Sequence, residues 1–261
     1  MSLPEELLCI TFSFLPPREI ILSIPHVSKH WKNIITSAPK ELAIVVNPAI
    51  EALAREACQN GCLHTLQTLS HFNLAYDYAM LAVSCRNGHL KVVQWLASQF
   101  KLTANDVRVY DNLALLSACE RGHLQVAQWL IPHFNLAADI HICENYAFRY
   151  SCYNGHLKLA QWLASRFNIN RDNAHADIRC ALIISCTHGH LHVAKWLTTH
   201  FNLTAKDARA RNNLAFSKSC ANGHSHVTQW LASHFNLTAD ARDNNNATVA
   251  TYNGLHPSIY K

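Results

Sequence analysis

Apolar residues recur at helical spacing through most of the chain. After each of a series of glycines they stand two, four, five, seven, eight and twelve positions on, which traces one broad face of an α-helix. Ahead of each glycine, segments such as NLALLSAC (112–119) and NLAFSKSC (213–220) form a second, shorter apolar stretch. The pattern predicts pairs of helices, with each pair joined by a tight turn at glycine.

This unit returns at a nearly constant interval, since four of the six spacings between the glycines are 33 or 34 residues. A period of this length is typical of helical solenoids, in which a helix pair buries its apolar faces only against its neighbours. The outer copies are degenerate, as capping repeats usually are, so we count a degenerate first copy, five clear repeats and a truncated last copy. The glycines are Gly61, Gly88, Gly122, Gly155, Gly189, Gly223 and Gly254.

Other residue types keep fixed places in the repeat. A cysteine precedes the glycine by three positions in six copies, and a tryptophan that we interpret as stacked core follows it by seven in five copies. A phenylalanine stands five residues after the tryptophan, and an asparagine usually follows it, where a left-handed residue would end the helix. Lys101 is the exception at that last place. The asparagines are Asn73, Asn135, Asn168, Asn202 and Asn236.

The stretches between repeats are polar. Segments such as 102–112 and 203–213 contain an Asp-x-Arg step and are too short for another helix with its turns, so we expect extended loops that project from one edge. Solenoids bind partners on their concave face and loop tips. The loop residues expected to contact a target are Arg108, Tyr110, His141, Arg171, Arg209, Arg211 and Arg242.

The second helix of the repeat resembles that of the ankyrin repeat, in which GH-x-x-V-x-x-LL opens the helix. The resemblance covers residues 47–261 and implies an all-α solenoid of stacked helix pairs. The TPLH signature of the family is missing from every copy, and the tryptophans mark a divergent style that resembles repeats expanded in amoebae and their giant viruses. The four best copies read GHLKVVQWL (88–96), GHLQVAQWL (122–130), GHLKLAQWL (155–163) and GHLHVAKWL (189–197).

Residues 3–34 lie outside the repeat. Their pattern predicts three short helices, over Glu5–Phe14, Arg18–Leu22 and Val27–Ile35, with Pro16 and Pro17 between the first two. So small a unit cannot bury all of its apolar residues by itself, and the apolar surface that is left predicts a partner.

This segment resembles an F-box, because it has Leu-Pro-x-Glu-Leu-Leu from residue 3, Ser-Phe-Leu from residue 13 and Val-x-Lys-x-Trp from residue 27. The resemblance implies a domain over residues 1–46 that docks on the Skp adaptor of a cullin-based ubiquitin ligase, followed by ankyrin repeats over 47–261. The alternative is a helical cap on the end of the solenoid. By position, the docking residues would be Leu3, Pro4, Leu7, Leu8, Leu15, Val27 and Trp31.

Cysteine and histidine chemistry is the other candidate, since the chain has 10 Cys and 18 His. Cys85 and His89 stand four apart, as a thiol and its base would on one helix face. The same pair recurs from repeat to repeat, however, which favours packing over a single polarised site. No C-x2-C pair or phosphate loop is present, so we expect no catalytic residue, no metal and no cofactor.

Charge and hydropathy limit the partners. The net charge of +5 is mild and no basic run has the density of a nucleic-acid arm, so we expect neither nucleic acid nor membrane as a partner. We find no secretory signal, which favours free thiols in the cytoplasm or the nucleus, and we expect a monomer. The function expected is substrate recognition for a Skp–cullin–F-box ligase, in a host cell if the source is viral or bacterial. The alternative is an ankyrin scaffold that acts without ubiquitin, or a decoy that sequesters the adaptor or a host protein.

Overall fold

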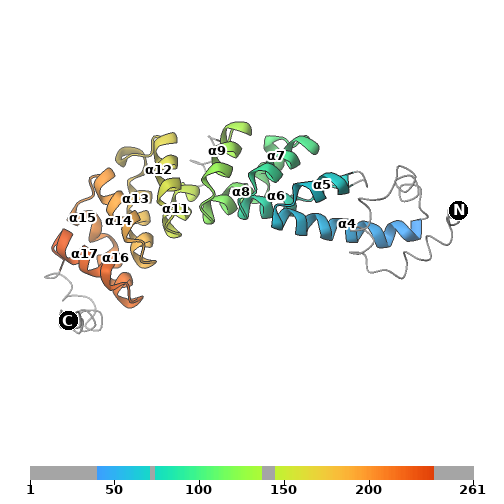
Figure 1. Cartoon of the computed structure of the whole chain (residues 1–261). Coiled ribbons are helices and arrows are strands. Elements are labelled where there is room, and N and C mark those ends of the chain that lie inside the picture. The colour runs from blue at the N-terminus through green and yellow to red at the C-terminus, as the bar shows by residue number, and fades with distance from the viewer. Residues whose placement is uncertain (1–39, 71–73, 137–144, 238–261) are drawn as a thin grey trace, which may run out of the picture. The chain divides into compact units, whose positions relative to one another are not determined.

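The computed structural model describes residues 40–70, 74–136 and 145–237, and every regular element in these ranges is a helix (Figure 1). This confirms the predicted all-α solenoid of stacked helix pairs. The chain divides into two compact units, residues 1–117 and 118–261. None of the helices in the described ranges is long and apolar enough to cross a membrane.

The first unit is built on a long helix, α4 (Lys40–Asn60), which packs against α5 (Leu63–Leu69) and α6 (Tyr78–Arg86). Helix α7 (Leu90–Gln99) packs in turn on α6, and α8 (Ala104–Glu120) follows it in the chain. The domain boundary predicted between residues 46 and 47 falls inside α4 and stays a prediction. The fully buried core residues of this unit include Cys58, Leu66, Leu69, Met80, Leu81, Cys85 and Leu96.

The second unit repeats one arrangement several times. Helix α9 (Leu124–His133) opens it, and the pairs that follow pack α11 (Tyr146–Tyr153) on α12 (Leu157–Arg166), and α13 (Arg171–Thr187) on α14 (Leu191–His200). The last pair is α16 (Ala210–Ala221) and α17 (Ser225–Phe235), with the short α15 (Ala205–Ala208) before it. Helix α13 lies between α11 and α16 and contacts both (Figure 1).

The predicted glycine turns are confirmed. The glycines from Gly61 to Gly223 all have φ between 71° and 77°, a left-handed conformation that only glycine adopts without strain. At Gly155 the turn is closed by two backbone hydrogen bonds, from the Gly155 N–H to the Cys152 carbonyl and from the His156 N–H to the Ser151 carbonyl, at 3.3 and 2.8 Å. The same two bonds recur at each clear repeat, so the turn is set by local geometry.

The left-handed helix ends are confirmed as well. Asn135, Asn168, Asn202 and Asn236 have φ between 48° and 53°. Lys101 adopts φ of 50° although lysine has no preference for this region. Beyond it the Leu102 N–H donates to the Ala97 carbonyl at 3.0 Å, the bond that closes a Schellman motif. Asn73 lies outside the described residues.

The extended loops predicted over 102–112 and 203–213 are wrong. Both stretches begin with helix: residue 104 opens α8, and residues 205–208 form α15. Asp106 accepts hydrogen bonds from the Thr103 N–H and hydroxyl at 2.7 and 2.6 Å, and Asp207 does the same for Thr204. A threonine followed three residues later by an acid is a helix-start signal, and this signal accounts for the Asp of the Asp-x-Arg step.

Left-handed residues then separate this added helical turn from the first helix of the pair. Tyr110 and Asn112 have φ of 50° and 61°, and the run 211–213 has φ between 51° and 58°. The chain therefore changes direction at a short break whose residues have non-helical φ and ψ. Tyr110 and Arg211 are exposed at these breaks, whereas Asn112 is buried.

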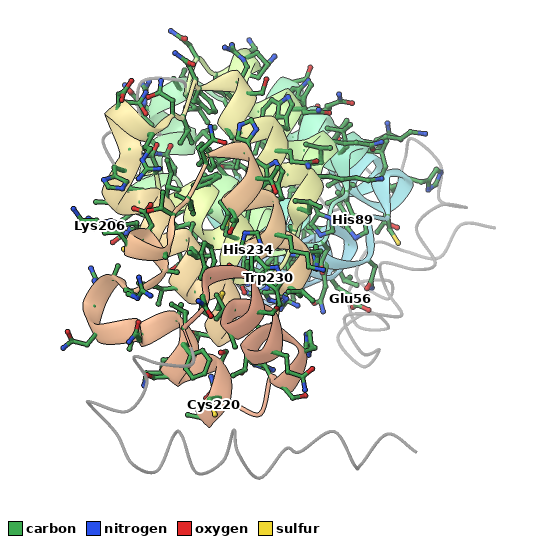
Figure 2. The ribbon with its side chains drawn as sticks, turned by 90° about the vertical axis from the view of Figure 1, so that its left-hand side faces the viewer. Glu56, His89, Lys206, Cys220, Trp230 and His234 are labelled. Carbon is green, nitrogen blue, oxygen red and sulfur yellow. The ribbon has the colours of Figure 1, made fainter. Side chains whose placement is uncertain are left out.

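The repeat tryptophans are partly buried, which agrees with a place at the edge of the stacked core. Four of the rings pack against the phenylalanine five residues on, as in the edge contact of Trp129 with Phe134 at 5.8 Å between centroids. In three copies a histidine four residues after the tryptophan stacks on its ring. The centroids of Trp129 and His133, for example, are 4.2 Å apart. Figure 2 shows the same pair, Trp230 and His234, side by side on α17.

Candidate target-binding site

Three positions on the first helix of the repeat differ from copy to copy. They stand nine, five and two residues before the glycine, whereas the cysteine three before it and the histidine after it are constant in the clear repeats. In the Gly155 copy all three are tyrosines, Tyr146, Tyr150 and Tyr153, and they are 42%, 39% and 43% exposed. Because these positions vary while their neighbours stay fixed, the repeat does not require one residue type there, and large exposed aromatics at them indicate binding.

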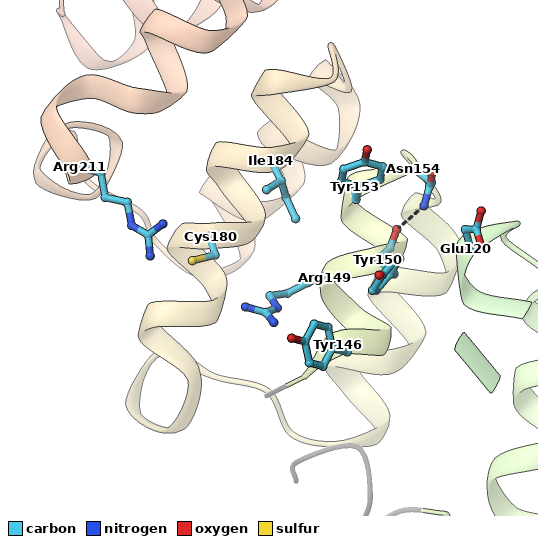
Figure 3. Close-up of a pocket in the computed structure, with 9 residues that line it drawn as sticks. All are labelled: Glu120, Tyr146, Arg149, Tyr150, Tyr153, Asn154, Cys180, Ile184 and Arg211. Atoms are coloured by element: carbon cyan, nitrogen blue, oxygen red, sulfur yellow. Dashed lines mark hydrogen bonds between the residues drawn. The ribbon is translucent and has the colours of Figure 1, made fainter. Parts of the chain in front are cut away.

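The tyrosines line a pocket of about 710 Å³ in the second unit (Figure 3). Helix α11 forms one wall, and α13 forms the facing wall with Cys180 and Ile184. Glu120 lies beside Asn154 at one side of the pocket, and Arg211 reaches toward Cys180 from the other. The residues that line the pocket are Glu120, Tyr146, Arg149, Tyr150, Tyr153, Asn154, Cys180, Ile184 and Arg211.

Arg149 is held in the middle of the pocket. Its guanidinium lies over the Tyr146 ring, 4.6 Å from the centroid, and its Nη1 is 3.7 Å from Asp177 Oδ1. The other oxygen of Asp177 accepts a hydrogen bond from Asn145 Nδ2 at 2.8 Å. Because Asp177 belongs to α13 and Asn145 precedes α11, these contacts fix the two walls relative to each other.

The tyrosine wall is supported from the next repeat. The ring of His188, at the end of α13, packs on Tyr153 with 4.1 Å between centroids. Burial lowers the pKa of His188, and the nearby His224 lowers it further, so this ring is neutral at pH 7. A neutral imidazole adds no positive charge to the surface of Tyr153.

Comparison with known protein families supports both halves of the sequence interpretation. The F-box domain model matches residues 1–42, and the model for ankyrin repeats (3 copies) matches residues 54–143. The chain is an F-box protein with ankyrin repeats. No curated protein matches it. The helix pairs beyond residue 143 repeat the glycine turn and the left-handed helix end of the matched copies.

The F-box residues predicted to dock on the Skp adaptor all lie outside the described residues. They are Leu3, Pro4, Leu7, Leu8, Leu15, Val27 and Trp31. His141 and Arg242, two of the expected target-binding residues, also lie outside them. The roles of these residues in the F-box–ankyrin protein stay predictions.

Arg211 alone among the other expected residues lines the pocket. Tyr110, 71% exposed, lies in the first unit with its ring against Tyr78, and Arg108 precedes it in α8. Arg209 is at the end of α15. Arg171 donates to the Asn202 carbonyl and to Asp207, at 2.7 and 2.8 Å, and so links α13 to the next repeat.

Sequence reasoning missed the tyrosines of the pocket. The signal that could have found them is a comparison of the copies at these three positions: the Gly189 copy has Cys180, Ile184 and Thr187, whereas the Gly155 copy has tyrosine at all three. The motif residues stand out in the sequence because they repeat, whereas the tyrosines occupy positions where the repeats differ.

The Cys-His pairs are packing residues, as predicted. The repeat cysteines from Cys58 to Cys186 are fully buried, and burial raises the pKa of Cys119 to about 12. A nucleophilic thiol needs the opposite shift. The histidines bond to the preceding repeat instead, through His89 Nε2 to the Gln59 carbonyl at 2.9 Å and His156 Nε2 to the Glu120 carbonyl at 2.8 Å.

Proposed function

We propose that this protein is the substrate-recognition subunit of a Skp–cullin–F-box ubiquitin ligase. The observation that carries the proposal is the match of residues 1–42 to the F-box domain on the same chain as a stack of ankyrin repeats. F-box domains dock on the Skp adaptor, and ankyrin stacks hold other proteins. One chain with both would bring a target to the ligase, in the cytoplasm or the nucleus.

The chain would act without a catalytic centre of its own. By holding the target beside the ligase, it converts a bimolecular encounter into an intramolecular one and raises the effective concentration of the target lysines. The binding energy for the adaptor would come from apolar F-box residues such as Leu7 and Trp31, because buried aromatic side chains dominate most interfaces.

We infer that the target contacts the pocket between α11 and α13. Tyrosine and arginine are enriched at interface hot spots, and this pocket has three tyrosines and two arginines among its lining residues. Its walls are fixed by the Asp177 contacts, so a bound segment would meet a surface that is already ordered.

Capture of purified Skp adaptor tests the ligase half of the proposal. The intact chain should retain the adaptor, and the double variant Leu7→Asp with Trp31→Ala should lose it. The control is Tyr150→Ala, which alters the pocket and should retain the adaptor fully. Equal capture by wild type and the double variant would refute F-box docking.

A second measurement separates a ligase subunit from a decoy that sequesters the adaptor. In cells, a target of a ligase subunit should disappear in a proteasome-dependent way when the intact chain is expressed, and persist with the double F-box variant. A target that is bound equally by both versions and never lost would indicate a scaffold or decoy.

A further inference from the structure

We propose that the pocket between α11 and α13 binds an acidic, extended segment of the target protein, with an apolar side chain of that segment against the tyrosines. This proposal rests on the adaptor function above and adds the chemical class of the target segment. It also names the residues that would select that segment, which neither family match supplies.

Charge complementarity is the first argument. Residues 118–136 and 145–237 contain eleven Lys and Arg but only four Asp and Glu, an excess of seven positive charges. Three of the four acids have a cation beside them: Asp177 has Arg149, Asp207 has Arg171, and Glu120 has Arg121 at 3.9 Å. This part of the chain therefore presents a positive field that an acidic segment would neutralise.

Arg211 places part of that charge at the pocket itself. It is exposed on the left-handed break at the start of α16, where φ is 51°, and it reaches toward Cys180 (Figure 3). Among the described residues, no hydrogen bond or ion pair holds its guanidinium. An arginine in this setting offers a planar pair of donors to a carboxylate, and the tyrosine hydroxyls offer further donors along the same wall.

The size of the tyrosine wall fits a short extended segment. Tyr146, Tyr150 and Tyr153 follow one face of α11, and seven residues of helix span roughly 10 Å. An extended chain covers that length with about three residues. A segment that lays an apolar side chain on the rings would direct its acidic side chains toward the side of the pocket that Arg211 lines.

Nucleic acid is the other polyanion to consider, and the pocket favours it less. Glu120 stands at one side and Asp177 contacts Arg149 inside the walls, so a row of phosphates would meet two carboxylates. Of the two arginines that line the pocket, Arg149 is already paired with Asp177, so a row of phosphates would find only Arg211 without a carboxylate beside it, whereas a peptide needs to place no more than one or two acids there.

Peptide selection on the intact chain in complex with the Skp adaptor tests the proposal. A displayed library of random twelve-residue peptides should yield sequences rich in Asp and Glu around one aromatic or aliphatic residue. A synthetic copy of a selected peptide should bind at least about tenfold more weakly to Arg211→Glu and to Tyr150→Ala. Lys158→Glu, an equal charge reversal on the exposed face of α12, should leave the affinity within twofold.

Several results would overturn the proposal. The selection could yield no peptide, or it could yield peptides without an excess of acidic residues. Arg211→Glu and Lys158→Glu could also weaken peptide binding equally. A twelve-nucleotide single strand that binds more tightly than the peptide and depends on Arg211 would assign the pocket to nucleic acid. Circular dichroism melting of each variant separates loss of binding from loss of fold. Capture of the Skp adaptor is measured on the same variants. If capture persists while one of these contrary results is obtained, the peptide proposal fails and the proposed adaptor function stands.

Discussion

His156 joins its repeat to the one before it by lying directly on Gly122. The imidazole Nε2 donates to the Glu120 carbonyl at 2.8 Å, and a Cβ placed on Gly122 would be 2.5 Å from the imidazole Nδ1. The same approach is found between Gly61 and His89. The glycine therefore has two roles in this chain: it permits the left-handed turn, and it leaves room for the histidine of the next repeat.

A Gly122→Ala substitution should destabilise the stack by more than backbone strain alone. The positive φ of 76° costs about 1–2 kcal/mol for alanine. Displacing His156 adds the loss of a hydrogen bond that contributes about 1 kcal/mol. We expect a total of roughly 2–3 kcal/mol, measured as a lower midpoint of urea unfolding of the full chain.

Gly223→Ala is the matched control. Gly223 has φ of 75°, but no described atom lies within 4 Å of the place that a Cβ would take. Its substitution should therefore cost only the strain, about 1–2 kcal/mol. Equal losses at the two glycines would show that the histidine contact contributes nothing to stability.

The sequence predicted what is local and repeated, and it failed where contacts cross between repeats. The turn at Gly155 and the helix end at Asn168 depend on residues close together in the chain, so the spacing of those residues was enough to predict both. The bond from His156 to Glu120 spans 36 positions, and nothing in the repeat pattern indicates which group a histidine contacts. The pocket was missed for a related reason, since Tyr150 and Ile184 face each other only after the helices stack.

A Lys101→Asn substitution should stabilise the first unit. Lys101 has φ of 50° at a helix end where the later repeats have asparagine. Asparagine tolerates this conformation better than lysine, so we expect a gain of about 0.5–1 kcal/mol in the free energy of unfolding. The measurement is the midpoint of chemical unfolding, and the reverse substitution Asn168→Lys should lower it by a similar amount. A loss on Lys101→Asn would contradict the assignment of strain to this residue.

Alkylation should separate the cysteines by burial. Burial raises the pKa of Cys119 and of Cys186 to about 12, so almost none of either thiol is ionised at pH 7.5, and both are shielded from reagent. Cys62 is exposed. Iodoacetamide followed by peptide mass spectrometry should therefore label Cys62 in minutes and leave Cys119 unmodified until urea is added. Rapid labelling of native Cys119 would revive the possibility of thiol chemistry.

Replacing Asp207 should loosen the connection between two repeats. The carboxylate is only 3% exposed and accepts hydrogen bonds from Arg171 Nη2, His175 Nε2 and the Thr204 N–H, at 2.8, 2.8 and 2.9 Å. An Asp207→Asn variant keeps the shape but loses the charge and turns one acceptor into a donor. Because Arg171 is partly exposed, we expect a moderate cost of about 1–3 kcal/mol at pH 7.

At low pH the Asp207→Asn variant and wild type should become equally stable. Burial by itself raises the pKa of Asp207, but the hydrogen bonds from Thr204 and His175 and the charge of Arg171 outweigh it and lower the pKa from 3.8 to about 2. A carboxyl with a lower pKa in the folded chain stabilises the fold fully above its unfolded value, and that stabilisation is lost as the pH falls toward 2. The gap in melting temperature between wild type and Asp207→Asn should therefore be constant from pH 7 to 5 and narrow below pH 4. The control is Asp172→Asn, at an exposed position in the first turn of α13, which should show a smaller gap in melting temperature at every pH. If the gap for Asp207→Asn persists unchanged at pH 2.5, the charge of the Asp207 carboxylate is not what holds the repeats together.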